Sequence, residues 1–303
     1  MNTHLNLGPV LFNWPVEKLK DFYFAIADEA PVDTVFLGEV VCSKRQPFFA
    51  PEIPEVAERL TQAGKRVIFS TLALVMTKRE MELVRELCDM DGVMIEANDI
   101  SACSKLMGRP HAVGPFVNVY NEGALGVMEQ QGATHISLPS ELSRNSLQAM
   151  AKVAKSDLEV QIFGRLPLAL SARCYHARSH GLAKDSCQYV CDKDPDGMDL
   201  DTLDGDPFLA VNGIQTMSYT CANLVGELDD LQSMGIRHFR LSPHDTNMAD
   251  VASIYRDVLD GKLEALEATE RLDDLMDGLP FANGFYYQSE GVKAKGTQEE
   301  FDL

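Results

Sequence analysis

A regular alternation of short apolar runs with longer helical patterns is the feature that most constrains the fold of this chain. Eight strand candidates lie at residues 5–12, 34–37, 66–70, 92–95, 112–119, 135–138, 159–163 and 238–241. Repeated strand–helix–strand units place their strands side by side and parallel, with the helices covering the sheet. Eight such units predict an α/β fold, a TIM-like (β/α)8 barrel that need not be perfectly regular. A doubly wound open sheet is the alternative that this alternation leaves open.

The intervening segments carry the apolar spacing of amphipathic helices. Helices are expected at residues 78–90, 123–131, 140–155 and 222–234. In the first of these, apolar side chains recur at three- and four-residue intervals, as a buried helix face requires. Gly64, Gly132 and Gly235 stand where helices would end before the next strand.

The spacing of the strands predicts one barrel domain over residues 1–303, interrupted once. Between the last two strands, residues of about 165–221 form an insertion too long for a single crossover. It holds Cys174, Cys187 and Cys191, with Cys221 at its end, together with an acidic stretch at 192–206 and an extended run at 208–219. Loops that follow strand C-termini carry function in this architecture, so the insertion is the first place to search for a site.

Composition narrows the classes of function. The formal net charge of −19 disfavours nucleic acid as a partner, because sequence-independent affinity for phosphate backbones depends on lysine and arginine. No apolar stretch approaches the roughly 18 residues of a membrane span, so none is expected. The N-terminus has no basic segment followed by an apolar one, so we expect a cytoplasmic protein with reduced thiols.

Three closely spaced cysteines indicate a metal or cluster site. Cys174, Cys187 and Cys191 lie within 18 residues, and the last two are four apart, which suits one helical turn or a tight loop. Zinc and iron–sulfur sites usually have four ligands, so a fourth is needed from elsewhere. Cys42, just beyond the second strand, is the better candidate, and Cys221 competes with it. The spacing alone does not separate zinc from an iron–sulfur cluster.

The two other cysteines, Cys88 and Cys103, lie within helical patterns and are expected in the core. Charged residues near Cys174 have several possible roles. His176 and His180 could complete a mixed cysteine–histidine zinc site, or lie beside a cluster without binding it. Arg173 and Arg178 could offset the negative charge of ligated thiolates, or form surface ion pairs.

Polar residues near strand ends supply candidates for a substrate pocket. Glu96, Asn118 and His244 each follow or end a predicted strand, at the barrel end where active sites gather. They could bind an aromatic acid or transfer protons. No catalytic residue is assigned beyond these three.

Several segments resemble the family once classed as U32 peptidases. The matching segments, spread over most of the chain, are 32–38 with 43–45 after it, 116–121, 164–174 with the cysteine segment that follows, and 281–286. Within the family, the length, the Gly164-Arg-Leu-Pro167 run and the context of Cys42 are most similar to short subunits of oxygen-independent ubiquinone biosynthesis. The peptidase label has little support, since the chain has neither a Gly-x-Ser-x-Gly nor a His-Glu-x-x-His motif.

The resemblance implies a 4Fe–4S cluster held by Cys42, Cys174, Cys187 and Cys191, and it is the reason for choosing Cys42 over Cys221. It also implies a heterodimer with a homologous, cluster-bearing subunit. The pair would hydroxylate an aromatic ubiquinone precursor without oxygen, with prephenate as the suggested oxygen donor. The alternatives are an interaction subunit with a structural metal site, zinc or cluster, and an RNA hydroxylase of the same family.

Overall fold

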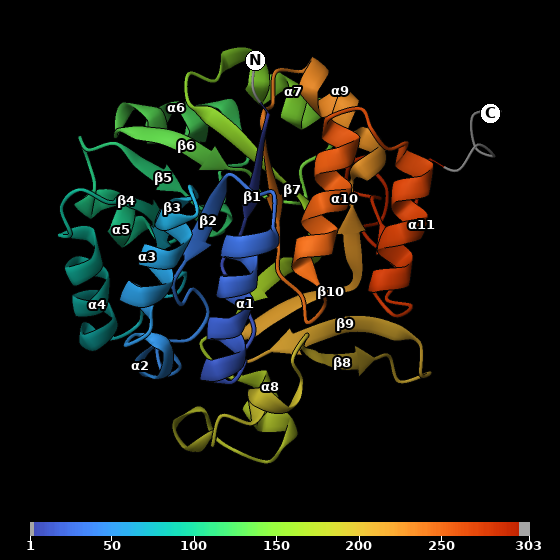
Figure 1. Ribbon diagram of the computed structural model, residues 1–303. Helices are drawn as coiled ribbons and strands as arrows, with labels where there is room; N and C mark the ends of the chain where they lie inside the picture. The colour runs from blue at the N-terminus through green and yellow to red at the C-terminus, as the bar shows by residue number, and fades with distance from the viewer. Residues whose placement is uncertain (1–2, 297–303) are drawn as a thin grey trace.

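Eight parallel strands close into a barrel in the computed structural model, which describes residues 3–296 (Figure 1). The barrel strands are β1 (His4–Leu7), β2 (Thr34–Leu37), β3 (Arg66–Ser70), β4 (Met94–Ala97), β5 (His111–Val113), β6 (Ala133–Ser137), β7 (Asp157–Leu170) and β11 (His238–Leu241). Strand β11 pairs in parallel with both β1 and β7, which closes the ring. The predicted barrel is therefore confirmed, and the open-sheet alternative is wrong.

Helices surround the barrel and cover its outer face (Figure 1). They are α1 (Val16–Glu29), α2 (Gln46–Phe49), α3 (Ile53–Gln62), α4 (Lys78–Cys88), α5 (Ile100–Lys105), α6 (Glu122–Gln130), α7 (Arg144–Val153), α9 (Leu228–Ser233), α10 (Met248–Leu259) and α11 (Ala265–Leu275). Capping residues determine where several of these helices begin. Thr77 and Glu80 form a capping box at α4, and the side chain of Asn121 caps α6. No helix among residues 3–296 is long and apolar enough to cross a membrane.

The helix expected at 222–234 is shorter than predicted. Residues 222 and 223 still belong to strand β10 (Gln215–Asn223), where Ala222 pairs with Gly164 of β7 and with Ala282 of β12 (Phe281–Ala282). A 3-10 turn, η4 (Val225–Glu227), follows before α9 begins at Leu228. Strand pairing at long range overrides the local helical spacing here.

The interior of the barrel is partly charged. Phe36, Ile68 and Ala112 form a small apolar cluster inside it, against which Met94 packs. Beside this cluster, the buried Arg240 side chain lies 2.6 Å from a Glu96 oxygen and 2.7 Å from a Glu159 oxygen. The guanidinium also stacks over the Phe36 ring, 4.0 Å from its centroid. These inward-facing residues link three strands by ion pairs within the ring.

The insertion begins within strand β7, which extends beyond the barrel. Beyond the barrel it pairs antiparallel with β10, and the sheet continues through β9 (Pro207–Asn212) to β8 (Met198–Asp201). The change of partners occurs at Gly164, whose φ is +106°, and a Cβ there would lie 2.6 Å from the Cβ of Ser242. Only glycine fits this position without strain.

The cysteine-bearing segment lies between β7 and β8 and protrudes at the lower end of the molecule in Figure 1. Its short elements are α8 (Tyr175–Ser179), η2 (Lys184–Ser186) and η3 (Val190–Lys193). The remaining 3-10 turn, η1 (Pro115–Val117), follows β5.

Candidate metal centre

Four cysteines line one small cavity at the end of the barrel where the strands have their C-termini. The lining of this cavity includes Cys42, Cys174, Cys187 and Cys191. The four come from the loop after β2, the start of α8 and the turn that joins η2 to η3. All seven cysteines of the chain are free of disulfides. The structure thus brings together the set of thiols that the sequence analysis grouped.

Around three of these cysteines the backbone forms a helix cap and a turn with left-handed residues. Cys174 is the N-cap of α8, and its sulfur accepts a hydrogen bond from the backbone N–H of Ala177 at 3.4 Å. Between Cys187 and Cys191, two consecutive residues adopt left-handed conformations, Gln188 at φ 49° and Tyr189 at φ 55°. Such conformations are unfavourable for residues with a Cβ and gather at functional sites. This tight turn brings both thiols to the same cavity.

Glu39 fixes the loop that carries Cys42. One oxygen of its carboxylate accepts hydrogen bonds from the backbone N–H groups of Val41 and Cys42, both at 2.8 Å. The same oxygen accepts a hydrogen bond from Nη2 of Arg45 at 2.8 Å. The carboxylate therefore ties the backbone at Cys42 to a buried guanidinium.

Arg45 is the charged group buried beside the cysteines. Only 4% of its side chain is exposed, and Nη2 also donates to the carbonyl of Leu11 at 3.0 Å. Sequence proximity to Cys174 pointed instead to Arg173 and Arg178 as the groups that offset thiolate charge, and both are exposed. The signal was available, since Arg45 belongs to the Ser43-Lys-Arg45 match to the family.

Burial favours the protonated form of two of these thiols, Cys42 and Cys191. It raises the pKa of Cys191 to about 11 and also raises the pKa of Cys42, although the Arg45 guanidinium partly opposes both shifts. Ligation by a metal would displace these protons, so binding releases protons to solvent. The amide of Asn13 donates to the sulfur of Cys191 at 3.3 Å, and such contacts favour the thiolate form.

The sulfurs stand further apart than the ligands of a single zinc ion. In a tetrahedral zinc site, with Zn–S distances of about 2.3 Å, the sulfurs lie roughly 3.8 Å apart. Among residues 3–296, no three cysteine sulfurs come within 4.8 Å of one another. A 4Fe–4S cluster binds each thiolate through a different iron and so needs a wider arrangement. Four thiols at one cavity are the donor set that such a cluster takes.

The other cysteines lie away from the cavity. Cys221 is fully buried in β10, where its thiol donates to the backbone carbonyl of Ala222 at 3.5 Å and burial raises its pKa to about 12. Cys88 and Cys103 are fully buried in α4 and α5 and belong to the apolar core, as predicted. Of the two candidates for a fourth ligand, only Cys42 lines the cavity.

The two histidines near Cys174 have other contacts. His176 lines the cavity, but its Nε2 lies 2.8 Å from a carboxylate oxygen of Asp194. His180 is exposed and stacks on His176, with ring centroids 5.7 Å apart. His176 and His180 therefore lie beside the cysteines, and Nδ1 of His176 has no hydrogen-bond partner among the described residues.

The three candidates for a substrate pocket do not meet. Glu96 is fully buried inside the barrel and is paired with Arg240. Asn118, in a left-handed conformation, lines a polar cavity of about 710 Å³ that opens between the loops after β5 and β6. His244 is buried elsewhere, where its Nε2 accepts from the backbone N–H of Arg165 at 2.9 Å. The three side chains therefore lie in separate surroundings.

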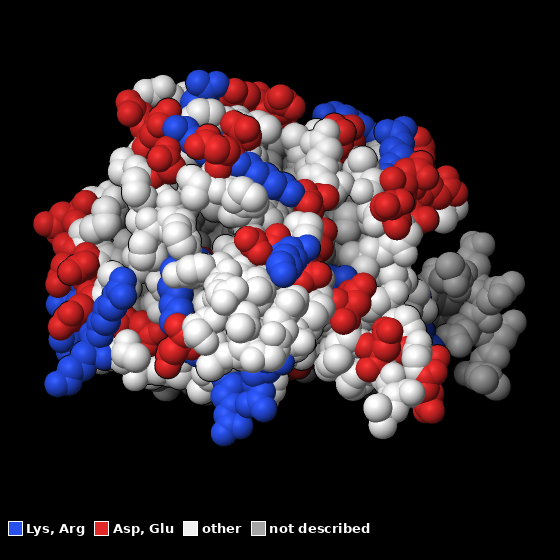
Figure 2. Space-filling model, turned by 90° about the horizontal axis from the view of Figure 1, so that it is seen from below, with Lys and Arg blue, Asp and Glu red and all other residues white. Residues whose placement is uncertain are grey.

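The end of the molecule that carries the cysteine segment faces the viewer in Figure 2. Uncharged side chains fill the middle of this face, while lysines and arginines border them alongside acidic groups. This face therefore carries charges of both signs around an uncharged middle, although the chain as a whole has a formal net charge of −19.

Known structures with related folds show weak likeness to this chain. A U32 peptidase matches with a TM-score of 0.46 and 12% identity, covering 80% of this chain and 94% of its own. A tryptophan synthase complex chain from Pyrococcus furiosus has a TM-score of 0.40 and 11% identity, covering 91% of this chain and 100% of its own. Phospho-2-dehydro-3-deoxyheptonate aldolase from Thermotoga maritima has a TM-score of 0.41 and 11% identity, covering 92% of this chain and 71% of its own. We draw nothing about activity from these likenesses.

The family model carries more weight, since it spans nearly the whole chain. The model described as peptidase family U32 matches residues 14–296, which include seven of the eight barrel strands, the cysteine segment and the C-terminal helices. This chain belongs to peptidase family U32.

Proposed function

We propose that this chain is a UbiV-like subunit that binds a 4Fe–4S cluster through Cys42, Cys174, Cys187 and Cys191. The observation that carries the proposal is the single cavity lined by four free thiols from three segments of the chain. When bound, such a cluster supplies one-electron transfer. Family membership supports the proposal, but the cluster and its use are our inference.

The residues around the cavity would adjust the site rather than react. Arg45 lies close enough to Cys42 and Cys191 for its charge to act on both thiols, and would offset the negative charge of four thiolates. The N–H groups of Asn13 and Ala177 donate to cysteine sulfurs, and hydrogen bonds to ligating sulfur raise a cluster's reduction potential. The small size and apolar walls of the cavity would keep water from the site.

We infer further that the subunit acts with a homologous UbiU-like partner in oxygen-independent hydroxylation of an aromatic ubiquinone precursor, with prephenate as oxygen donor. An open, largely apolar pocket lies between α3 and α4, with Leu37, Phe69 and Leu87 in its wall. It includes Glu39, the residue that anchors the Cys42 loop. Its chemistry suits an isoprenoid-substituted ring, and its position would put that ligand beside the cysteine loop.

Deletion of the gene in its host should abolish ubiquinone made without oxygen and leave ubiquinone made with oxygen intact. Complementation with Cys187→Ser should fail, since a ligand is lost, while Cys221→Ser should restore the quinone. Quinone extraction and chromatography from both cultures measure this. Unchanged quinone in both conditions would exclude the proposed pathway. Altered RNA hydroxylation with normal quinone would favour an RNA hydroxylase instead.

A further inference from the structure

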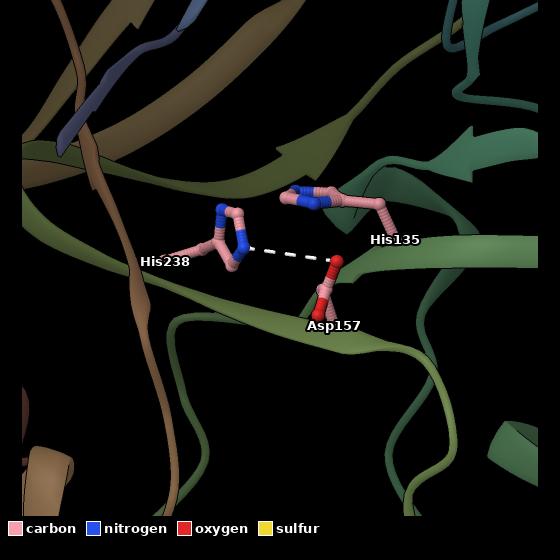
Figure 3. Close-up of side chains that lie close together, drawn as sticks. All are labelled: His135, Asp157 and His238. Atoms are coloured by element: carbon pink, nitrogen blue, oxygen red, sulfur yellow. Dashed lines mark ion pairs between the residues drawn. The ribbon is translucent and has the colours of Figure 1, made fainter. Parts of the chain in front are cut away.

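We propose that His135, Asp157 and His238 bind a divalent transition-metal ion at the N-terminal end of the barrel, opposite the cysteine cavity. Figure 3 shows the three side chains directed toward one another from separate strands. One ligand atom from each lies within 4.8 Å of the others. This site is distinct from the cysteines and independent of the function proposed for them.

Strand register explains why these three residues meet. His135 of β6 is the register partner of Asp157 of β7, and His238 of β11 is the partner of Glu159, two residues further along β7. Residues two apart on a strand share a face, so all four side chains lie on one side of the sheet. Because the barrel closes through β7 and β11, residues far apart in sequence come together at its closing seam.

The unpaired ring nitrogens of the buried His135 are the strongest indication of a binding site here. Its side chain is 4% exposed, and neither ring nitrogen has a hydrogen-bond partner among the described residues. Buried polar groups are nearly always satisfied, and leaving one unsatisfied is unfavourable. Nε2 faces a Glu159 oxygen at 3.4 Å. A proton on Nε2 would leave the Nδ1 lone pair for a metal, in the carboxylate–histidine–metal arrangement typical of bound histidines.

His238 and Asp157 provide the complementary ligands. Nε2 of His238 lies 3.8 Å from Oδ2 of Asp157, near the ligand spacing that one ion between them requires. Nδ1 of His238 lies 3.4 Å from the Asn6 amide nitrogen, so an ion bound at Nε2 would move the ring proton from Nε2 to Nδ1 and break this contact.

Two imidazoles and one carboxylate are a donor set for zinc and its first-row neighbours. The Asp157 side chain is 67% exposed, which gives an ion a path from solvent and leaves room for water as a further ligand. Bound there, the ion would link β6, β7 and β11 across the seam that closes the barrel.

The test uses the full-length protein and Zn²⁺ alone as the probe. In equilibrium dialysis, the wild-type chain should bind one more zinc per chain than Asp157→Asn, whose exposed position makes the fold tolerant of the change. Asp201→Asn, at an exposed aspartate of β8, is the matched control and should bind as many ions as the wild type. At 100-fold excess over Kd, the extra ion should raise the melting temperature by about 4 °C.

Nitrogen-15 NMR of the histidine rings locates the ion. Zinc should shift the ring resonances of His135 and His238, and His238→Gln should remove the same ion that Asp157→Asn removes. Equal zinc binding by the wild type and both variants would overturn the proposal, as would ring resonances that zinc leaves unmoved. Neither readout depends on the cysteine site, so failure here is distinguishable from failure of the proposed function.

Discussion

Arg240→Met should lower the free energy of unfolding by about 3–5 kcal/mol at pH 7, because it leaves buried carboxylates without their cation. Arg240 is the shared partner of Glu96 and Glu159, and both carboxylates are fully buried inside the barrel. Methionine fills a similar volume over Phe36 but provides no charge. Urea-induced unfolding, followed by circular dichroism, measures the change.

The pH dependence of this loss has a definite sign. Burial alone would raise the pKa of Glu159, but Arg240 and His135 hold it well below its usual range. In the wild type, Glu159 therefore contributes stability above its unfolded pKa of about 4.3, which is lost as the pH falls through the folded pKa. Without Arg240, burial raises the pKa of the Glu159 carboxyl, so acid protonates this group and stabilises the variant. The difference between the two proteins should shrink from pH 7 to pH 5.

Arg271→Met is the matched control, since Arg271 pairs with Glu267 on the exposed surface of α11. Exposed pairs contribute about 0–1 kcal/mol, so its stability should stay close to that of the wild type. Equal losses in the two variants, or a loss for Arg240→Met that does not change with pH, would contradict the role given to the interior ion pairs.

Arg45→Met should destabilise the protein by about 3 kcal/mol and reduce the metal retained by the cysteine cavity. The substitution leaves Glu39 without its cation and removes one of the two donors to the carbonyl of Leu11, the other being the Asn212 amide. Because Glu39 also holds the backbone N–H of Cys42, the loop that carries this ligand would loosen. Denaturant unfolding and metal analysis of the same preparation measure both effects.

Arg59→Met provides the comparison for Arg45, because the Arg59–Asp28 pair is about half exposed on both sides. Its stability should change by about 1 kcal/mol or less, with metal content unchanged. If Arg45→Met retained full stability and full metal content, Arg45 would be no more than a neighbour of the site.

Local periodicity was sufficient to predict the barrel. Strands such as 66–70 and 238–241 are short, apolar and bounded by helical patterns, so each is recognisable from its own residues. The extension of β7 to Leu170 could not be predicted in the same way. Its antiparallel pairing with β10 depends on contacts about fifty residues away, and the same contacts shortened the helix expected at 222–234.

The candidate site likewise has a part that local sequence predicts and a part that only long-range contacts determine. Spacing grouped Cys174, Cys187 and Cys191, but choosing Cys42 over Cys221 required the family resemblance, because both follow strand-like runs. The burial of Arg45 is a property of tertiary packing that sequence does not report. The group of His135, Asp157 and His238 was missed because strand register and barrel closure, rather than sequence spacing, bring it together.

The most direct test of the central claim is to purify the protein without oxygen and to measure its iron, acid-labile sulfide and zinc. The account predicts about four irons and four sulfides per chain. Both should be lost in Cys42→Ser, Cys174→Ser, Cys187→Ser and Cys191→Ser and kept in Cys221→Ser. Zinc at the cysteines without sulfide, or iron retained in Cys42→Ser, would contradict it.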